Sequence, residues 1–114
     1  MSDASGLPAW EFAVVEAERA AAGRLYEEFL SVPDLSAGLY VLEAGGTDPQ
    51  SPHTEDELYY VVSGRGSVTV GDASGDVATG SMVFVAAGIP HRFHDITERL
   101  ELLVVFGPAE GSRG

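Results

Sequence analysis

Short apolar segments separated by glycine and proline constrain the fold of this chain more than any other feature of its sequence. Each segment is rich in valine, leucine, isoleucine or aromatic residues, and turn-forming residues follow it. Such a succession of short strands is typical of a β-sandwich or β-barrel. We expect strands at 25–30, 39–42, 58–62, 67–70, 82–85, 91–96 and 100–106, with a break at 64–66 and turns at 71–76.

One helix is expected ahead of the strands, over residues 10–22. This segment is rich in alanine and glutamate, Phe12 and Val15 fall near one face, and Gly23 can end the helix. A strand over 12–15 is the alternative. We therefore expect a flexible N-terminal arm at 1–9, a single domain with its helix at 10–107, and a flexible tail at 108–114.

Composition limits the classes of partner. The 114-residue chain has a net charge of −12, so a nucleic-acid backbone or an anionic membrane surface would repel it. It has no cysteine, which excludes disulfides and thiolate metal sites. No apolar run approaches the roughly 20 residues of a transmembrane helix, and the first residues lack the basic start of a signal peptide. We expect a cytoplasmic protein that binds neither nucleic acid nor membrane.

Several of the expected strands are apolar on both faces, namely 39–42, 58–62 and 102–106. A strand in a single-layer barrel normally has one face in water. The helix can cover one sheet, and a second copy of the chain can cover the other. The pattern therefore predicts a homodimer.

The stretch 50–57 places a histidine among acids directly before a strand. His53 and Glu57 are four residues apart, so on a straight strand they would lie about 13 Å apart and could not share an ion. A turn over 54–56, with His53 ending one strand and Glu57 starting the next, would bring them together and leave Glu55 and Asp56 facing water. The alternative is an acidic turn without chemistry, or the capped start of a short helix.

The other two histidines lie in one expected strand. His91 follows Pro90 and opens the strand, whereas His94 points to the opposite face. The two are therefore not expected to bind one ion together, and a packing or surface role is the expectation for His94.

The order and spacing of these residues resemble two motifs of the cupin superfamily. The first motif runs Gly, His, His, Glu, Gly, and here its positions are Gly45, Ser51, His53, Glu57 and Gly64. The chain is therefore similar to small single-domain cupins with a conserved barrel, over about residues 36–107.

The second cupin motif runs Gly, Pro, Gly, His, Asn. The matching positions here are Gly80, Ala86, Gly88, His91 and Asp95. Ala86 and Asp95 depart from the motif, and we expect these departures to be structurally mild.

The resemblance implies an all-β, cupin-type jelly-roll β-barrel with one N-terminal helix and a metal site formed by His53, Glu57 and His91. Ser51 stands where the first motif histidine usually ligates the metal. Gln50 or Ser51 could supply a weak oxygen donor instead. A 2-His-1-carboxylate set suits one divalent transition metal such as Fe, Mn, Ni or Zn.

The implied function is a small metal-dependent enzyme of dioxygenase or oxidoreductase type that acts on a small organic molecule. Alternatives are a metal-dependent isomerase or polyketide-type cyclase, and a binding module without catalysis. Glu57 and Tyr59 are the candidate catalytic residues, since Tyr59 shares the strand face of Glu57. The candidates for the pocket lining are Tyr40, Tyr59, Phe84, Phe93 and Phe106.

Overall fold

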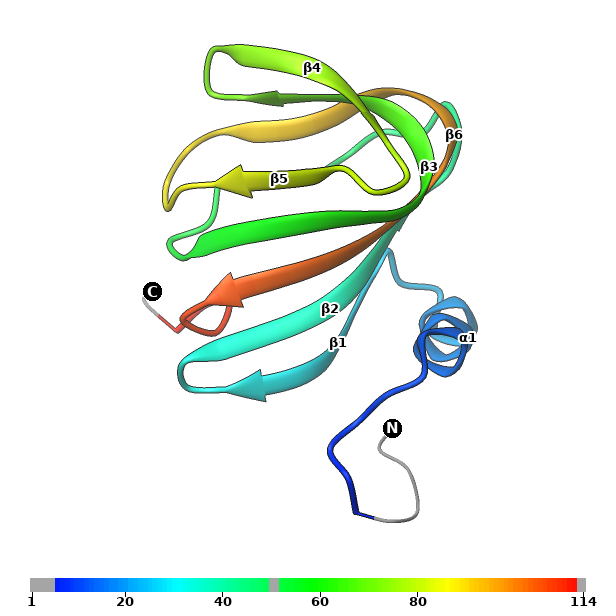
Figure 1. Cartoon of the computed structure of the whole chain (residues 1–114), viewed down its shortest axis with the longest axis vertical. Coiled ribbons are helices and arrows are strands. Elements are labelled where there is room, and N and C mark those ends of the chain that lie inside the picture. The colour runs from blue at the N-terminus through cyan, green and yellow to red at the C-terminus, as the bar shows by residue number, and fades with distance from the viewer. Residues whose placement is uncertain (1–5, 50–51, 113–114) are drawn as a thin grey trace.

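The computed structural model describes residues 6–49 and 52–112 and forms a jelly-roll β-barrel with one helix on its outside (Figure 1). Every strand pair that it contains is antiparallel. The expected fold class is confirmed. The elements of the described residues are α1 (Phe12–Ala22), β1 (Tyr26–Val32), β2 (Leu35–Leu42), β3 (Asp56–Val70), β4 (Ala73–Ala78), β5 (Met82–Val85) and β6 (His91–Gly107).

Two long strands, β3 and β6, run through both layers of the barrel. The first part of β3 pairs with β5 on one side and with the end of β6 on the other. The later part of β3 pairs with β4 and with the beginning of β6. Strands β1 and β2 extend the first layer next to β6. Both long strands therefore bend as they pass from one layer to the other, as Figure 1 shows.

The bend of β3 lies at Gly64, where we expected the strand to break. The strand continues through this position, and the pairing with β6 shifts register around it. Gly64 has a φ of 107°, and a Cβ built there would collide with the Arg99 carbonyl oxygen of β6. Glycine at this position thus bends the strand without ending it. The expected pair of strands at 91–96 and 100–106 is likewise one strand, β6.

Other element boundaries also differ from those expected. Strand β4 (Ala73–Ala78) begins inside the segment 71–76 that was predicted as turns, because β3 offers it a pairing edge that local propensity does not reveal. Strand β2 begins four residues before the predicted start, at Leu35. The helix begins at Phe12 and ends before Gly23, which is left-handed (φ 69°), and this confirms the predicted stop.

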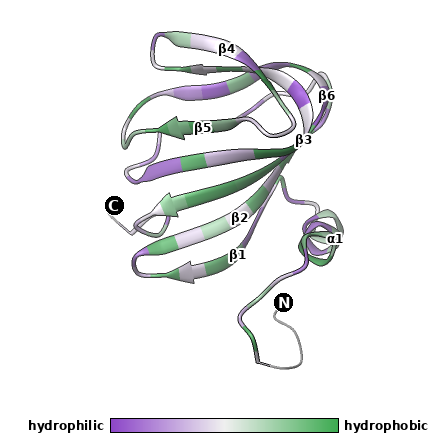
Figure 2. Ribbon diagram, viewed as in Figure 1, coloured by the Kyte–Doolittle hydropathy of each residue, from purple (hydrophilic) through white to green (hydrophobic). Residues whose placement is uncertain are grey.

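The hydrophobic core fills the space between the two layers. Its largest fully buried side chains include Tyr59, Phe93, Leu100 and Phe106. Figure 2 shows that the apolar residues also extend over strand β5, which lies at the edge of its layer. Four of the large hydrophobic side chains on β3 and β5 are exposed to solvent, namely Leu58, Tyr60, Met82 and Phe84.

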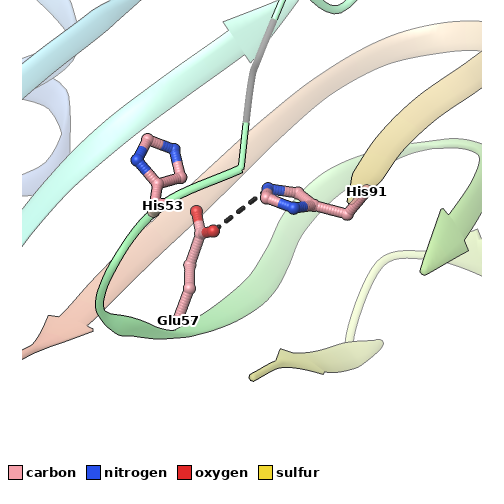
Figure 3. Close-up of side chains that lie close together, drawn as sticks. All are labelled: His53, Glu57 and His91. Atoms are coloured by element: carbon pink, nitrogen blue, oxygen red, sulfur yellow. Dashed lines mark ion pairs between the residues drawn. The ribbon is translucent and has the colours of Figure 1, made fainter. Parts of the chain in front are cut away.

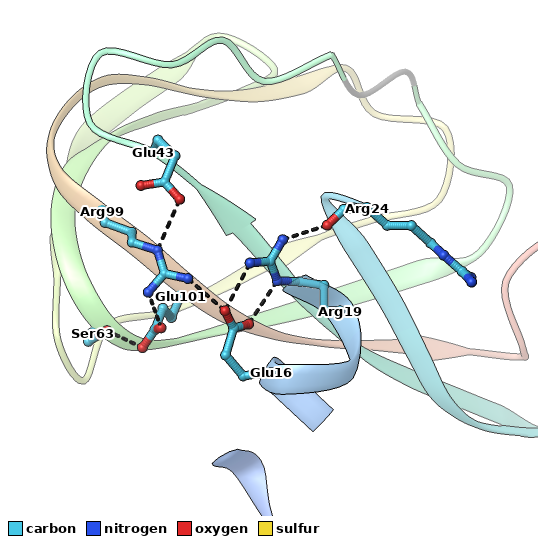
Figure 4. Close-up of polar contacts among 7 residues, drawn as sticks. All are labelled: Glu16, Arg19, Arg24, Glu43, Ser63, Arg99 and Glu101. Atoms are coloured by element: carbon cyan, nitrogen blue, oxygen red, sulfur yellow. Dashed lines mark hydrogen bonds and ion pairs between the residues drawn. The ribbon is translucent and has the colours of Figure 1, made fainter. Parts of the chain in front are cut away.

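A network of arginines and glutamates joins α1 to the barrel (Figure 4). Glu16 of the helix accepts hydrogen bonds from Arg19 at 2.7 Å and from Arg99 of β6 at 2.6 Å. Arg99 also donates to Glu101 at 2.6 Å and to Glu43 at 3.1 Å. The neighbouring arginines lower the pKa of Glu16, with the Arg19 hydrogen bond as the main cause and burial opposing it. The helix is thus held in place by charge as well as by packing.

Among the described residues, no helix is both long and apolar enough to cross a membrane.

The corner at Gly64 gives a direct test of this architecture. We expect Gly64→Ala to lower the free energy of unfolding by at least about 2 kcal/mol, because the new methyl group meets the backbone of β6 and the positive φ disfavours alanine. Urea unfolding followed by circular dichroism measures the change. Gly75→Ala in β4 is the matched control, since a Cβ there meets nothing within 4 Å. Equal stability of the two variants would contradict the proposed role of the corner.

Candidate metal centre

Three side chains from separate segments converge inside one end of the barrel: His53, Glu57 and His91 (Figure 3). Each offers one nitrogen or carboxylate oxygen, and these atoms all lie within 4.8 Å of one another. A spacing of this size allows one ion to contact all three residues after small side-chain movements. The three residues predicted as ligands are therefore brought together.

The chain positions these residues by different means. Glu57 is the second residue of β3 and His91 is the first residue of β6, so the pairing of the two layers fixes both. His53 lies in the loop before β3. This differs from our prediction, in which His53 ended a strand. The Gly88 N–H donates a hydrogen bond of 2.7 Å to the His53 carbonyl oxygen, which ties the two motif loops together.

Glu57 carries the strongest electrostatic constraint of the site. Its side chain is 1% exposed, and neither carboxylate oxygen has a hydrogen-bond partner of good geometry. The Nε2 atom of His91 lies 3.1 Å from Oε1 of Glu57. Like the two carboxylate oxygens, this Nε2 atom lacks a well-formed hydrogen bond. A buried carboxylate without hydrogen bonds is costly unless a cation compensates it. These unsatisfied atoms and the mixed nitrogen and oxygen donors fit a divalent metal ion.

A hydrogen bond fixes the ring of His91. Its Nδ1 lies 3.0 Å from the Ile89 carbonyl oxygen, which can only accept, so Nδ1 carries the proton and Nε2 turns toward Glu57. Burial alone would lower the pKa of His91. The close contact with the Glu57 carboxylate, the hydrogen bond to the Ile89 carbonyl and the charge of Glu57 together outweigh burial, so the pKa of His91 is raised.

The ring of His53 is held between an aromatic side chain and an acid. Its centroid lies 4.9 Å from that of Phe106 in an edge-on arrangement, and its Nδ1 lies 3.5 Å from Oε2 of Glu110. Burial raises the pKa of Glu110, and the charge of His53 opposes this rise. Glu110 belongs to the segment predicted as a tail. Part of this segment packs on the barrel, since Ala109 is buried, while its flexibility stays a prediction.

The remaining predicted residues have other surroundings. Tyr59 is fully buried, with its ring 6.0 Å from that of His91 and 4.9 Å from that of Phe93, so it supports the ring of His91 from inside the core. His94 lies outside the cluster and contacts Thr69 and Asp95. Gln50 and Ser51, the weak candidate ligands, lie outside the described residues.

Glu55 does not face water, contrary to our expectation. It is 2% exposed and accepts a hydrogen bond of 3.0 Å from the Gly111 N–H. The prediction was wrong because the acceptor role of Glu55 depends on a segment 56 residues away. Asp56 is exposed, as predicted.

A cavity of about 280 Å³ opens beside the cluster. Of the residues predicted to line the pocket, Tyr40 and Phe106 are confirmed. Tyr59 and Phe93 are packed in the hydrophobic core. The prediction for Phe84 was wrong, because this residue lies on the outer face and is 59% exposed. The cavity is lined by Leu25, Tyr26, Tyr40, Pro49, His53, Glu57, Val104, Phe106 and Glu110.

Sequence reasoning missed three polar residues in or beside this cavity: Tyr26, Asp48 and Glu110. Asp48 is buried, accepts a hydrogen bond of 2.6 Å from the Tyr40 hydroxyl, and also accepts one from the Phe93 N–H. Burial, with nearby carboxylates adding to it, raises the pKa of Tyr26, so its hydroxyl stays protonated. The register of Tyr26 opposite Tyr40 was the signal that could have placed Tyr26 at the cavity.

The family model for the cupin domain (Cupin_2) matches residues 38–106 of the chain. An uncharacterized protein of Streptomyces coelicolor is 54% identical over 96 residues, which cover 84% of this chain and 91% of that protein. The family model includes both motif regions, and residues 107–114 lie outside it.

Solved structures share the fold at low identity. An RmlC-like cupin of Shewanella frigidimarina has a TM-score of 0.68 and 20% identity, over 78% of this chain and 79% of that one. KdgF of a Halomonas species has a TM-score of 0.69 and 18% identity, over 78% and 82%. A protein of Bacillus halodurans has a TM-score of 0.73 and 19% identity, over 95% and 86%.

The Glu57–His91 pair predicts a pH effect in chelator-treated protein. Because folding raises the pKa of His91, the pair contributes its full stability below about pH 6.5, the ordinary value for histidine, and loses it as the pH rises through the folded pKa. Between pH 6 and pH 8, we expect the unaltered protein to lose more unfolding free energy than the Glu57→Gln variant. Urea unfolding at both pH values measures it. A difference that stays constant with pH would contradict the assignment.

Proposed function

Because this chain belongs to the cupin domain family, we propose that it is a small metal-dependent enzyme acting on a small organic molecule. In this proposal His53, Glu57 and His91 hold one divalent transition metal ion, and the molecule binds in the adjoining cavity. We place it in the dioxygenase or oxidoreductase class. A cytoplasmic location is proposed on the lack of cysteine alone.

The single observation that supports the metal most strongly is the state of Glu57. A carboxylate that is 1% exposed and has two oxygens without hydrogen bonds is costly to bury, and a cation beside it removes that cost. His91 supplies a second possible ligand, because its Nε2 is held 3.1 Å from Oε1 of Glu57. Two histidines and one carboxylate suit Fe, Mn, Ni or Zn and leave positions open for a substrate.

The metal and the protein would divide the chemistry. When bound, the ion acts as a Lewis acid toward substrate oxygen atoms and can support oxygen chemistry. Val104 and Phe106 give the cavity apolar walls that exclude water. Tyr40 is fixed by its hydrogen bond to Asp48, whereas the buried Tyr26 hydroxyl has no partner in the described structure and would have to move to donate to a substrate oxygen. Glu57 can accept a proton if the substrate displaces it from the ion.

Two other functions use the same site. A metal-dependent isomerase or cyclase would need the same ligands but no oxygen, and a binding module would hold the molecule without turnover. Oxygen consumption by the metal-loaded protein with enols, diols or thiols separates the first class from the other two. Product analysis without oxygen then separates isomerase from binder.

Metal binding is the first test of the proposal. We expect the purified or reconstituted protein to hold one ion per chain, measured by elemental analysis. We expect His91→Ala to weaken binding by roughly 100-fold or more, since loss of an outer-shell partner of a ligand alone costs 10–100-fold.

His94→Ala is the matched control, because His94 lies outside the cluster of possible ligands. It should keep its metal. If neither the unaltered protein nor a reconstituted sample binds a transition metal, the proposed function is wrong. If His91→Ala binds as tightly as His94→Ala, the assignment of ligands is wrong.

We also propose that the chain forms a homodimer through the outer face of β3 and β5. Leu58 pairs across the strands with Phe84, and Tyr60 pairs with Met82, so the four exposed side chains form one continuous surface. A two-fold interface uses the same patch on both subunits. This uncharged patch can meet its own copy, whereas other parts of a chain with a net charge of −12 repel theirs.

Light scattering tests this assembly. We expect a dimer at about 10 μM and a monomer for Phe84→Asp, which puts a charge in the centre of the patch. Leu35→Asp is the control, because Leu35 is exposed on β2, away from β5 in the sheet order. A monomeric unaltered protein, or a dimeric Phe84→Asp, would contradict the proposal.

A further inference from the structure

The segment that follows β6 is fastened to the barrel next to the metal centre. The Glu110 N–H donates a hydrogen bond of 2.8 Å to Ser36, and the Gly111 N–H donates one of 3.0 Å to Glu55. Both acceptor side chains belong to buried residues, with Ser36 at 0% and Glu55 at 2% exposure. Two buried acceptors thus fix the backbone on either side of the Glu110 side chain.

This fastening directs the Glu110 side chain into the site. Its Oε2 lies 3.5 Å from Nδ1 of His53, and Glu110 lines the same cavity as Glu57. A histidine that binds a metal through one nitrogen commonly donates the proton on its other nitrogen to a carboxylate. With Glu110 beside Nδ1, the proton of a neutral His53 belongs on Nδ1, and Nε2 is the nitrogen that can bind an ion.

We propose that Glu110 completes the metal centre: it holds His53 in the orientation that an ion requires, and its charge makes the loaded site prefer an uncharged ligand to an anion. This inference rests on the proposed function. Glu110 is a positioning residue toward the metal and a specificity residue toward the substrate. It lies outside residues 38–106, which the family model matches.

The charge argument follows from the groups around the cavity. A divalent ion would bring two positive charges, and the carboxylates of Glu57 and Glu110 at the cavity oppose them, with Asp48 and Glu55 buried nearby. None of the residues that line the cavity in the described part of the chain is an arginine, and the sequence has no lysine. Nothing in this lining therefore compensates the charge of an anionic substrate. The preferred substrate class is a small, uncharged, partly apolar molecule with an oxygen that can face the ion.

The first measurement is zinc affinity at pH 8, by competition with a chromogenic chelator. We expect Glu110→Gln to bind Zn²⁺ 10–100-fold more weakly than the unaltered protein, the usual cost of losing such a partner. Glu98→Gln is the matched control: it removes the same charge from an exposed side chain whose ion pair with Arg65 spans 3.7 Å. It should bind Zn²⁺ normally. Circular dichroism confirms that the variants are folded.

The second measurement compares two small probes on the Co²⁺-loaded proteins, the azide anion and neutral imidazole, by visible absorption. We expect Glu110→Gln to raise the affinity for azide relative to imidazole by roughly tenfold, because the variant removes one negative charge beside the ion. Glu110→Asp keeps the charge but shortens the reach to His53. It should weaken zinc binding and leave the preference for imidazole unchanged.

The outcomes separate this inference from the proposed function. If Glu110→Gln and Glu98→Gln have the same zinc affinity, the positioning role is overturned although the metal site stands. If Glu110→Gln leaves the azide-to-imidazole ratio unchanged, the specificity role is overturned. If the unaltered protein binds neither Zn²⁺ nor Co²⁺, both the proposed function and this inference are wrong.

Discussion

The burial of the Glu57 carboxylate is the constraint around which the inner end of the barrel is arranged. A carboxylate excluded from water and without hydrogen bonds opposes folding unless positive charge lies beside it. His91 can supply part of that charge by taking up a proton, and a metal ion can supply it in full. The same residue pair therefore accounts for the raised pKa of His91 and for the fit of a cation.

The architecture brings these residues together through its two long strands. Because β3 and β6 pair along most of their lengths, the start of β6 lies next to the end of β3, and the start of β3 lies next to the end of β6. Glu57 and His91 are therefore on different layers, and both face the interior. The corner at Gly64 allows one strand to contribute to both layers, so a glycine seven residues after Glu57 on the same strand contributes to the geometry of the site.

Much of this arrangement could be predicted from the sequence, for reasons that differ from residue to residue. His53, Glu57 and His91 were predictable because the chain resembles two cupin motifs, in which the spacing of the ligands to glycines is set by local turns. The continuity of strand β3 could not be predicted, because glycine ends a strand by propensity, and Gly64 bends the strand without ending it only because β6 pairs with it. Glu55 and Glu110 were missed because each depends on a contact between segments that are far apart in the sequence.

The loops of the site also support one another, and this links ligand binding to stability. The His53 loop is held by Gly88 from the second motif and, through Glu55, by Gly111 from the last segment. Three segments therefore meet at the cluster, and an ion that contacts His53, Glu57 and His91 would connect them directly. Because such an ion binds the folded chain and not the unfolded one, it would stabilise the barrel in proportion to its affinity and concentration. In a small domain, where a single core provides limited stability, the proposed metal centre would then contribute to the folding free energy.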